Sequence, residues 1–213
     1  MNPLILPLLA SAILGFALLK KGGPSASAPH RRALVIGDSH SEAPWTFGGR
    51  INAMLQGRGL ISDVEGNRGW SVRRYLNTGA LISALTKQRP DLLVVALGAN
   101  DQVSDAQSDS YKRSLREFLN YARGAGVREV VWFGPSKSEG SQAHRMPTRR
   151  RVARLQMEVL RDPQTKNLYR PMKISWVDSM PLTADLPTRD GVHMGPSEYQ
   201  TWASRAAPSL SLV

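Results

Sequence analysis

Two segments of this sequence carry residue types that can act together in nucleophilic catalysis. Ser39 lies in Gly37-Asp38-Ser39, directly after a short apolar run, where a tight turn would lift its hydroxyl out of a sheet. Asp190 and His193 are three residues apart near the C-terminus. At that spacing the carboxylate can hold one imidazole nitrogen while the other nitrogen faces the serine. These residues predict nucleophilic catalysis by Ser39, with His193 as the general base.

Two further segments could stabilise the negative charge that develops on an attacked carbonyl oxygen. Asn100, in Gly98-Ala99-Asn100-Asp101, can offer its amide to such an oxyanion. Gly69, in Asn67-Arg68-Gly69-Trp70-Ser71, could bring a backbone N–H close to the same oxygen. Each segment by itself also fits an ordinary turn or helix cap. Their order and their positions after predicted strands favour the catalytic interpretation.

The elements that must position these residues alternate between strands and helices. Strands are expected at 33–36, 61–65, 91–97, 129–133 and 174–177. The clearest helix between them has Tyr111, Leu115, Phe118, Leu119 and Ala122 on one face. This alternation predicts an α/β fold with a parallel sheet that is covered on both sides. Ligands of such folds bind at the carboxyl ends of the strands, where the polar segments fall.

The four segments, taken in order, resemble the four conserved blocks of the SGNH (GDSL-like) hydrolases. The resemblance extends from Ala33 to about Pro208. It implies a three-layer α/β/α, flavodoxin-like fold with a five-stranded parallel sheet. It also implies that Ser39 attacks an ester carbonyl, that His193 takes the serine proton, and that Asp190 orients His193. The oxyanion hole would consist of the backbone N–H groups of Ser39 and Gly69 and the amide of Asn100. The resemblance implies no metal and no organic cofactor.

Two positions depart from the pattern of that family. His40 follows the serine, where an apolar residue is common, and Trp70 follows Gly69 in a block that lacks its usual second glycine. Neither change removes a catalytic atom. Both are expected to affect the shape of the pocket, so His40 and Trp70 are predicted to line the substrate site.

The N-terminal segment is predicted to be a membrane anchor. Residues 3–19 are apolar and uncharged, and Lys20 and Lys21 follow them. At ~1.5 Å per residue a helix over this run spans ~26 Å, slightly less than the ~30 Å core of a bilayer. A cleaved signal peptide and a buried core helix are the alternatives. The expected organisation is therefore an anchor at 1–21, a Gly/Ser/Ala/Pro linker at 22–32 and the hydrolase domain at 33–213.

The membrane side is left open by two conflicting arguments. Basic residues around the linker favour a cytoplasmic domain by the positive-inside rule. A substrate in the cell wall would instead require the opposite side of the membrane.

The composition limits the classes of function. No cysteine is present, which excludes disulfides and a thiol nucleophile. The formal net charge of +11 favours contact with polyanions in general. Residues 145–154 open a basic helix with an apolar face at Val152, Leu155 and Val159, and its charges are expected to be solvated. His30 and His144 are also expected to be solvated. No motif for base-specific nucleic-acid recognition accompanies them.

The sequence thus predicts a membrane-tethered serine carboxylic-ester hydrolase. The favoured substrate is O-acetylated carbohydrate of a cell wall or surface polymer, since no insertion suggests the lid of a long-chain lipase. A lysophospholipase or thioesterase at the membrane surface is the enzymatic alternative. A non-catalytic, membrane-anchored virion or envelope component that retains the hydrolase fold is the alternative from another class.

Overall fold

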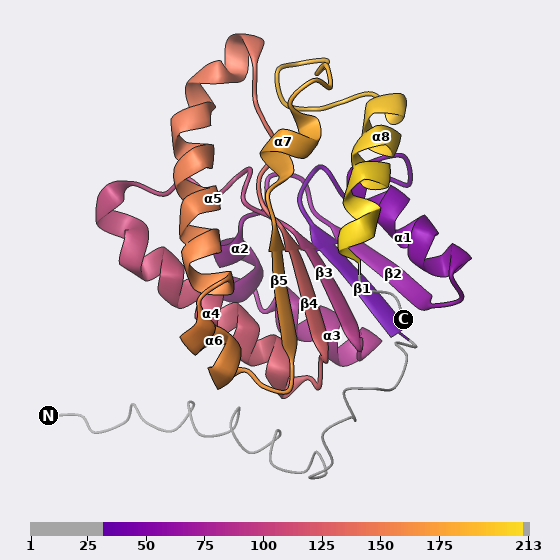
Figure 1. The fold of residues 1–213 in the computed structure, drawn as a ribbon, viewed down its shortest axis with the longest axis vertical. Coiled ribbons are helices and arrows are strands. Elements are labelled where there is room, and N and C mark those ends of the chain that lie inside the picture. The colour runs from indigo at the N-terminus through magenta and orange to yellow at the C-terminus, as the bar shows by residue number, and fades with distance from the viewer. Residues whose placement is uncertain (1–31, 211–213) are drawn as a thin grey trace, which may run out of the picture.

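The computed structural model describes residues 32–210, which form a parallel sheet with helices on both faces (Figure 1). The strands are β1 (Arg32–Gly37), β2 (Ile61–Gly66), β3 (Leu92–Ala96), β4 (Glu129–Phe133) and β5 (Lys173–Val177). They form one five-stranded sheet in the order β2-β1-β3-β4-β5, and every neighbouring pair is parallel. This is the flavodoxin-like order. The predicted α/β class with five parallel strands is confirmed.

Helices enclose the sheet from both sides and form the outer layers. They are α1 (Phe47–Gly57), α2 (Val72–Asn77), α3 (Ala80–Gln88), α4 (Ser108–Gly124), α5 (Met146–Leu160), α6 (Pro163–Leu168), α7 (Ser179–Thr183) and α8 (Pro196–Ala206). Short 3₁₀ turns span Asp105–Gln107, Gly140–Arg145 and Ala207–Ser209. Helices α1 and α8 pack on one face of the sheet, and α2 to α5 pack on the other (Figure 1).

Each central strand contributes to two hydrophobic cores. On β1, Leu34 and Ile36 pack with α2 to α5, whereas Ala33 and Val35 pack with α1 and α8. Side chains alternate across a strand, so a sheet covered on both faces needs apolar residues at every position. This explains why the strands read as unbroken apolar runs. The apolar stripe predicted on α4 is also buried against the sheet.

The domain boundary differs by one residue from the prediction. Arg32, assigned from sequence to the linker, belongs to β1 and pairs in register with Ile61. Its backbone N–H also donates to Asp91 Oδ2 at 3.1 Å, so the residue is part of the folded sheet. The predicted anchor, the rest of the linker and His30 lie outside the described residues. Within residues 32–210 no helix combines the length and apolar character needed to cross a membrane.

The polar segments gather at the carboxyl edge of the sheet. Ser39 follows β1, Gly69 follows β2 and Asn100 follows β3. Helix α7 and the chain leading from it to α8, which carries His193, lie at the same end of the molecule (Figure 1). Parallel strands place all their carboxyl ends at one edge, which brings together residues that are far apart in sequence.

Candidate active site

Ser39 sits in a tight turn directly after β1. Ser41 N–H closes this turn by donating to the carbonyl of Asp38 at 2.9 Å. A Cβ on Gly37 would come within 2.1 Å of Ser41 Oγ, so this position needs glycine for the chain to pass. The Ser39 residue is 8% exposed. The turn therefore holds the serine in a nearly enclosed position at the edge of the sheet.

A continuous chain of hydrogen bonds joins Ser39, His193 and Asp190. Ser39 Oγ lies 2.9 Å from His193 Nε2, and His193 Nδ1 lies 2.7 Å from Asp190 Oδ2. Asp190 Oδ1 also accepts the backbone N–H groups of Val192 and His193, at 3.0 and 2.7 Å. The short turn from Asp190 to His193 thus fixes the carboxylate against both the backbone and the ring. The three-residue spacing brings the two side chains into direct contact, as predicted.

These hydrogen bonds stabilise the ionised form of Asp190. Desolvation raises the pKa of Asp190, but hydrogen bonds from the His193 backbone, the His193 ring and the Val192 backbone outweigh it. The net pKa lies well below the ordinary value of an aspartate. Asp190 is therefore ionised throughout the neutral range, and it favours the imidazole tautomer that carries a proton on Nδ1.

The three predicted oxyanion donors lie on neighbouring loops. Within residues 32–210, the backbone N–H groups of Ser39 and Gly69 donate to no other protein group. Gly69 has φ of +72°, a left-handed conformation that glycine adopts without strain. Asn100 Nδ2 lies 3.3 Å from Asp38 Oδ2 and 3.4 Å from the carbonyl oxygen of Trp70, so it stands between the other two loops. These long contacts leave the amide able to turn toward a better acceptor.

Two buried carboxyl groups, to which the sequence assigned no role, connect these loops. Asp38 is 1% exposed and accepts the His40 backbone N–H at 3.0 Å as well as the Asn100 amide. Asp101 accepts the Val72 N–H at 3.1 Å and so ties the Asn100 loop to the start of α2. Burial raises the pKa of Asp38 to about 6 and that of Asp101 to about 7. Both positions were visible in the motifs, but burial could not be read from them.

His40 is buried beside His193, with 5.5 Å between the two ring centroids, and its predicted place in the substrate pocket stays a prediction. The residue is 3% exposed, and its Nδ1 lies 2.8 Å from Tyr199 Oη while its Nε2 lies 3.4 Å from Ser136 Oγ. Burial, followed by the positive charges of Arg149 and His193, lowers the pKa of His40 to about 3, so its ring is neutral. His40 therefore connects the Ser39 turn to α8 and to the loop after β4.

Trp70, the other predicted pocket residue, is half-buried beside the Gly69 loop. Its ring packs edge-on against Tyr75, with 4.8 Å between the ring centroids. The guanidinium of Arg74 lies 5.2 Å from the centre of the Trp70 ring. These contacts anchor Trp70 to α2, and its exposed part remains available to a substrate.

The basic helix predicted at residues 145–154 is only partly solvated. Arg150 is exposed, and so is His144 in the preceding 3₁₀ turn, as expected. Arg149, by contrast, is 2% exposed, and Arg151 pairs with Asp105. The sequence pattern could not separate the buried arginine from its neighbours because long basic side chains occur in both environments.

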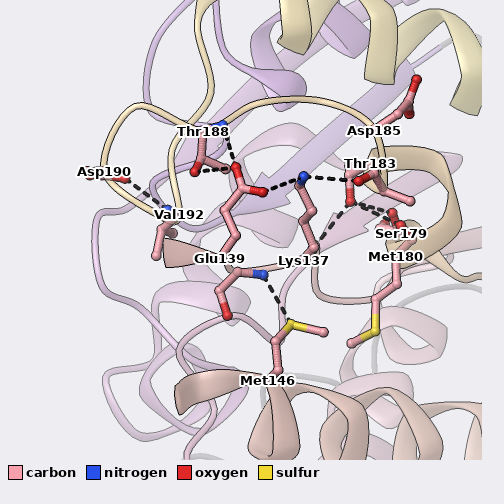
Figure 2. Close-up of polar contacts among 12 residues, drawn as sticks. Lys137, Glu139, Met146, Ser179, Met180, Thr183, Asp185, Thr188, Asp190 and Val192 are labelled. Atoms are coloured by element: carbon pink, nitrogen blue, oxygen red, sulfur yellow. Dashed lines mark hydrogen bonds and ion pairs between the residues drawn. The ribbon is translucent and has the colours of Figure 1, made fainter. Parts of the chain in front are cut away.

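Glu139 fastens the loop that carries Asp190 and His193, and sequence alone did not identify it. Its Oε1 accepts the backbone N–H and the hydroxyl of Thr188, both at 2.8 Å, and its Oε2 pairs with Lys137 Nζ at 2.7 Å. The Glu139 backbone N–H also donates to the carbonyl of Gly191 at 2.9 Å. Figure 2 shows the Glu139 carboxylate between Thr188 and Lys137. The link spans the loop after β4 and the turn between Asp190 and His193.

The backbone at Gly191 permits this close contact. Gly191 has φ of +85°, and a Cβ there would lie 2.5 Å from the carbonyl oxygen of Glu139. The hydrogen bonds from Lys137, and then those from Thr188, lower the pKa of Glu139 to about 2. A carboxylate whose pKa is lowered loses its stabilising contacts only as the pH falls toward that value. The Glu139 contacts therefore persist across the whole neutral range.

Replacing Glu139 should impair turnover more than stability. Glu139→Ala removes the acceptor of Thr188, so the Asp190–His193 turn should lose its fixed geometry and kcat should fall by about tenfold or more, with little change in KM. Glu139→Gln keeps an oxygen for Thr188 and should recover part of the rate. Steady-state kinetics and melting temperatures of both variants measure this, with exposed Glu117→Ala as the control. A Glu139→Ala protein with a lower melting temperature but wild-type kcat would show that the contact is only structural.

Within the described residues, no group of three or more His, Cys, Asp or Glu side chains is arranged to hold a metal ion. The chemical groups at the edge of the sheet are therefore a hydroxyl, an imidazole, a carboxylate and several N–H donors. This set suits the attack of a serine on a carbonyl carbon.

Comparison with solved structures shows the same architecture in several other proteins. TesA matches with a TM-score of 0.62 and 16% identity over 85% of this chain and 98% of its own. A catalytic mutant of Axe2, an acetylxylan esterase from Geobacillus stearothermophilus, matches with a TM-score of 0.62 and 18% identity over 86% and 95% of the two chains. A structure described as a GDSL-like lipase from Parabacteroides merdae matches with a TM-score of 0.66 and 16% identity over 86% and 96%. At these identities the similarity demonstrates a common fold.

Sequence comparison identifies the family directly. A search of curated proteins gives no match. The model of the GDSL-like lipase/acylhydrolase family, however, matches residues 35–200, which include Ser39, Gly69, Asn100, Asp190 and His193. The match covers well over half of the chain and agrees with the order of the four motifs. This chain therefore belongs to the GDSL-like lipase/acylhydrolase family.

Proposed function

We propose that this serine ester hydrolase is an O-acetylesterase that acts on cell-wall or surface carbohydrate, with Ser39 as the nucleophile. The observation that carries the proposal is the unbroken hydrogen-bond chain from Asp190 through His193 to Ser39. Such a chain lets the imidazole accept the serine proton as the hydroxyl attacks.

The first half of the reaction acylates Ser39. Ser39 Oγ attacks the carbonyl carbon of the ester while its proton passes to His193 Nε2. Asp190, which is ionised, stabilises the imidazolium that forms. The tetrahedral intermediate then collapses: the bond to the alcohol oxygen breaks, and His193 returns the proton to that oxygen. The acyl group remains on Ser39.

The second half of the reaction releases the acid. Water attacks the acyl carbon and gives its proton to His193, which passes it to Ser39 Oγ as the acyl bond breaks. In both halves the oxyanion is bound by the N–H groups of Ser39 and Gly69 and by the Asn100 amide. Donors that are already in position cost no reorganisation when the charge appears, and one such donor contributes roughly 10²–10³-fold to kcat.

The choice of an acetyl group on carbohydrate rests on two arguments. Axe2, described as an acetylxylan esterase, shares the fold over most of both chains. No insertion in the sequence suggests the lid that a lipase for long chains would need. Attachment to a membrane through residues 1–21 remains part of the proposal, supported by the charge-free apolar run at residues 3–19.

A lysophospholipase or thioesterase acting at the membrane surface is the second candidate. The similarity to a structure described as a GDSL-like lipase favours it. A non-catalytic virion or envelope component would not need the hydrogen-bond chain, so the intact contacts of Ser39, His193 and Asp190 argue against that alternative.

The length of the acyl chain separates the two enzymatic candidates. We expect kcat/KM for p-nitrophenyl acetate to exceed that for the laurate ester by about tenfold or more. In a pocket built for an acetyl group, each methylene that does not fit costs about 1–3 kcal/mol of transition-state binding. Ser39→Ala should lower kcat by roughly 10⁴-fold or more and leave the melting temperature unchanged. A preference for laurate would favour the lipase, whereas a folded Ser39→Ala protein with wild-type turnover would contradict the whole assignment.

The activity should rise from acid to alkaline pH along a limb set by His193. Only the neutral imidazole of His193 can accept the serine proton, so kcat/KM should be larger at alkaline than at acid pH. Asp190 does not contribute to this limb because its pKa lies well below the range measured. Asp190→Asn removes the charge that supports the imidazolium and should lower kcat by roughly 10²-fold or more.

Asp38 needs a control in the same experiment, because burial raises its pKa to about 6 and it also changes charge in this range. Asp38→Asn keeps an oxygen that can accept the His40 N–H, so the limb should persist in this variant. A pH–rate profile from pH 5 to 9 with p-nitrophenyl acetate, recorded for wild type, Asp38→Asn and Asp190→Asn, measures this. If the limb disappeared in Asp38→Asn, or if the wild-type profile were flat, His193 would not be the base.

A further inference from the structure

A cleft of about 550 Å³ opens beside Asn100, outside the hydrogen-bond chain of Ser39. Ala99 and Asp101, the two neighbours of Asn100, line one wall together with the residues that follow them. The opposite wall is the last part of the Gly140–Arg145 turn and the first turn of α5. Because Ala99 and Asp101 flank Asn100 in the chain, a group bound in this cleft would lie close to the Asn100 loop.

The cleft carries positive charge with little to neutralise it. Among the residues that the structure describes, Arg151 is the one cleft arginine in an ion pair, since its Nε lies 2.8 Å from Asp105 Oδ1, while the buried carboxyl of Asp38 acts on Arg149 electrostatically. The Arg145 side chain makes no hydrogen bond or ion pair with any residue of the described range 32–210. Asp101 is the one acidic residue in the lining, and burial raises its pKa to about 7. The lining therefore has an excess of cations at neutral pH.

Arg149 is buried with part of its hydrogen-bonding capacity unused. It is 2% exposed, and its Nη1 donates to the carbonyl oxygens of Ser136 and Lys137 at 3.0 and 2.6 Å. Its Nε and Nη2 have no partner within the described part of the chain. Burying a charged group with unsatisfied donors is costly, so such donors in a folded protein require an explanation. Burial lowers the pKa of Arg149 to about 10, although the nearby carboxyl of Asp38 acts in the opposite direction and the charge of Arg145 adds to the lowering.

The start of α5 adds to the same field. This helix of 15 residues begins at Met146 and has no acidic residue in its first turn and no side-chain cap. Acidic residues are favoured at this end because the helix dipole is positive there. Here Arg145 and Arg149 stand at that end instead, where the dipole repels them. An anion in the cleft would relieve this repulsion.

We propose that this cleft binds an anionic group, a carboxylate or a phosphate, carried by the carbohydrate whose acetyl ester is cleaved. The inference rests on the proposed O-acetylesterase function and specifies its substrate as an acidic sugar. Arg145 and the first turn of α5 contact the anion. The buried Arg149 adds positive charge below the cleft surface without touching the anion. Arg151, already paired with Asp105, contributes least.

Binding of matched sugars to the full-length protein tests this proposal without requiring catalysis. Dissociation constants are measured by ligand-observed NMR for galacturonate against galactose, and for glucose 6-phosphate against glucose. We expect the acidic member of at least one pair to bind about tenfold more tightly, as a charge-assisted contact would provide. The pair that meets this expectation identifies the anion as a carboxylate or a phosphate. Equal binding within both pairs would overturn the proposal.

A matched pair of variants separates the cleft from the general basic charge of the protein. Arg145 is partly exposed, so Arg145→Gln should fold. In this variant the ratio of the dissociation constants of the neutral and the acidic sugar should fall close to one. Arg150→Gln removes the same charge from α5 itself, but its side chain is exposed and outside the cleft, so the preference should persist. If both variants lost the preference equally, a general field and not the cleft would be responsible.

The two proposals fail in distinguishable ways. In hydrolysis assays with p-nitrophenyl acetate, the preferred acidic sugar should act as a competitive inhibitor of the wild type, with Arg150→Gln hydrolysing the ester at the wild-type rate. Hydrolysis that no acidic sugar inhibits would contradict the placement of the cleft beside the reacting ester. Selective binding of acidic sugars by a protein that hydrolyses no ester would instead contradict the proposed function.

Discussion

The contact between His193 Nε2 and Ser39 Oγ is the constraint that the rest of the site must satisfy. These two atoms lie 2.9 Å apart although their residues are separated by 154 positions in the chain. The parallel sheet makes this possible because it places the carboxyl ends of all five strands at one edge. The apolar strands and the two hydrophobic cores therefore determine where the loops with the catalytic residues begin.

The sheet fixes only where the loops begin. Hydrogen bonds from buried and half-buried side chains then hold the loops in the positions that catalysis needs. Asp38 binds the Asn100 amide, and Asp101 binds the start of α2 beside the Gly69 loop. Glu139 holds Thr188 and Gly191 on the turn that carries His193. Each link is local, but together they join the ends of β1, β3 and β4 to the C-terminal loop. Pre-organised groups of this kind act on the transition state without further movement.

The sequence allowed the sheet, its strands and the Asp190–His193 contact to be predicted, because apolar periodicity and motif spacing are local properties. It did not reveal Glu139 or the burial of Arg149, which depend on residues brought together by the fold. The burial of His40 was not visible for the same reason, because Tyr199 and Ser136 hold its ring in the interior. Burial of a polar side chain is decided by its neighbours in space, and a single sequence does not display them.

Covalent labelling with a fluorophosphonate tests the central claim most directly, because the reagent traps an activated serine without needing the natural substrate. The labelled protein is digested, and the modified residue is located by mass spectrometry. The account predicts modification of Ser39, with labelling lost in Ser39→Ala and strongly slowed in His193→Ala, whose imidazole can no longer accept the serine proton. Labelling of a different serine, or no labelling of a correctly folded protein, would contradict the account.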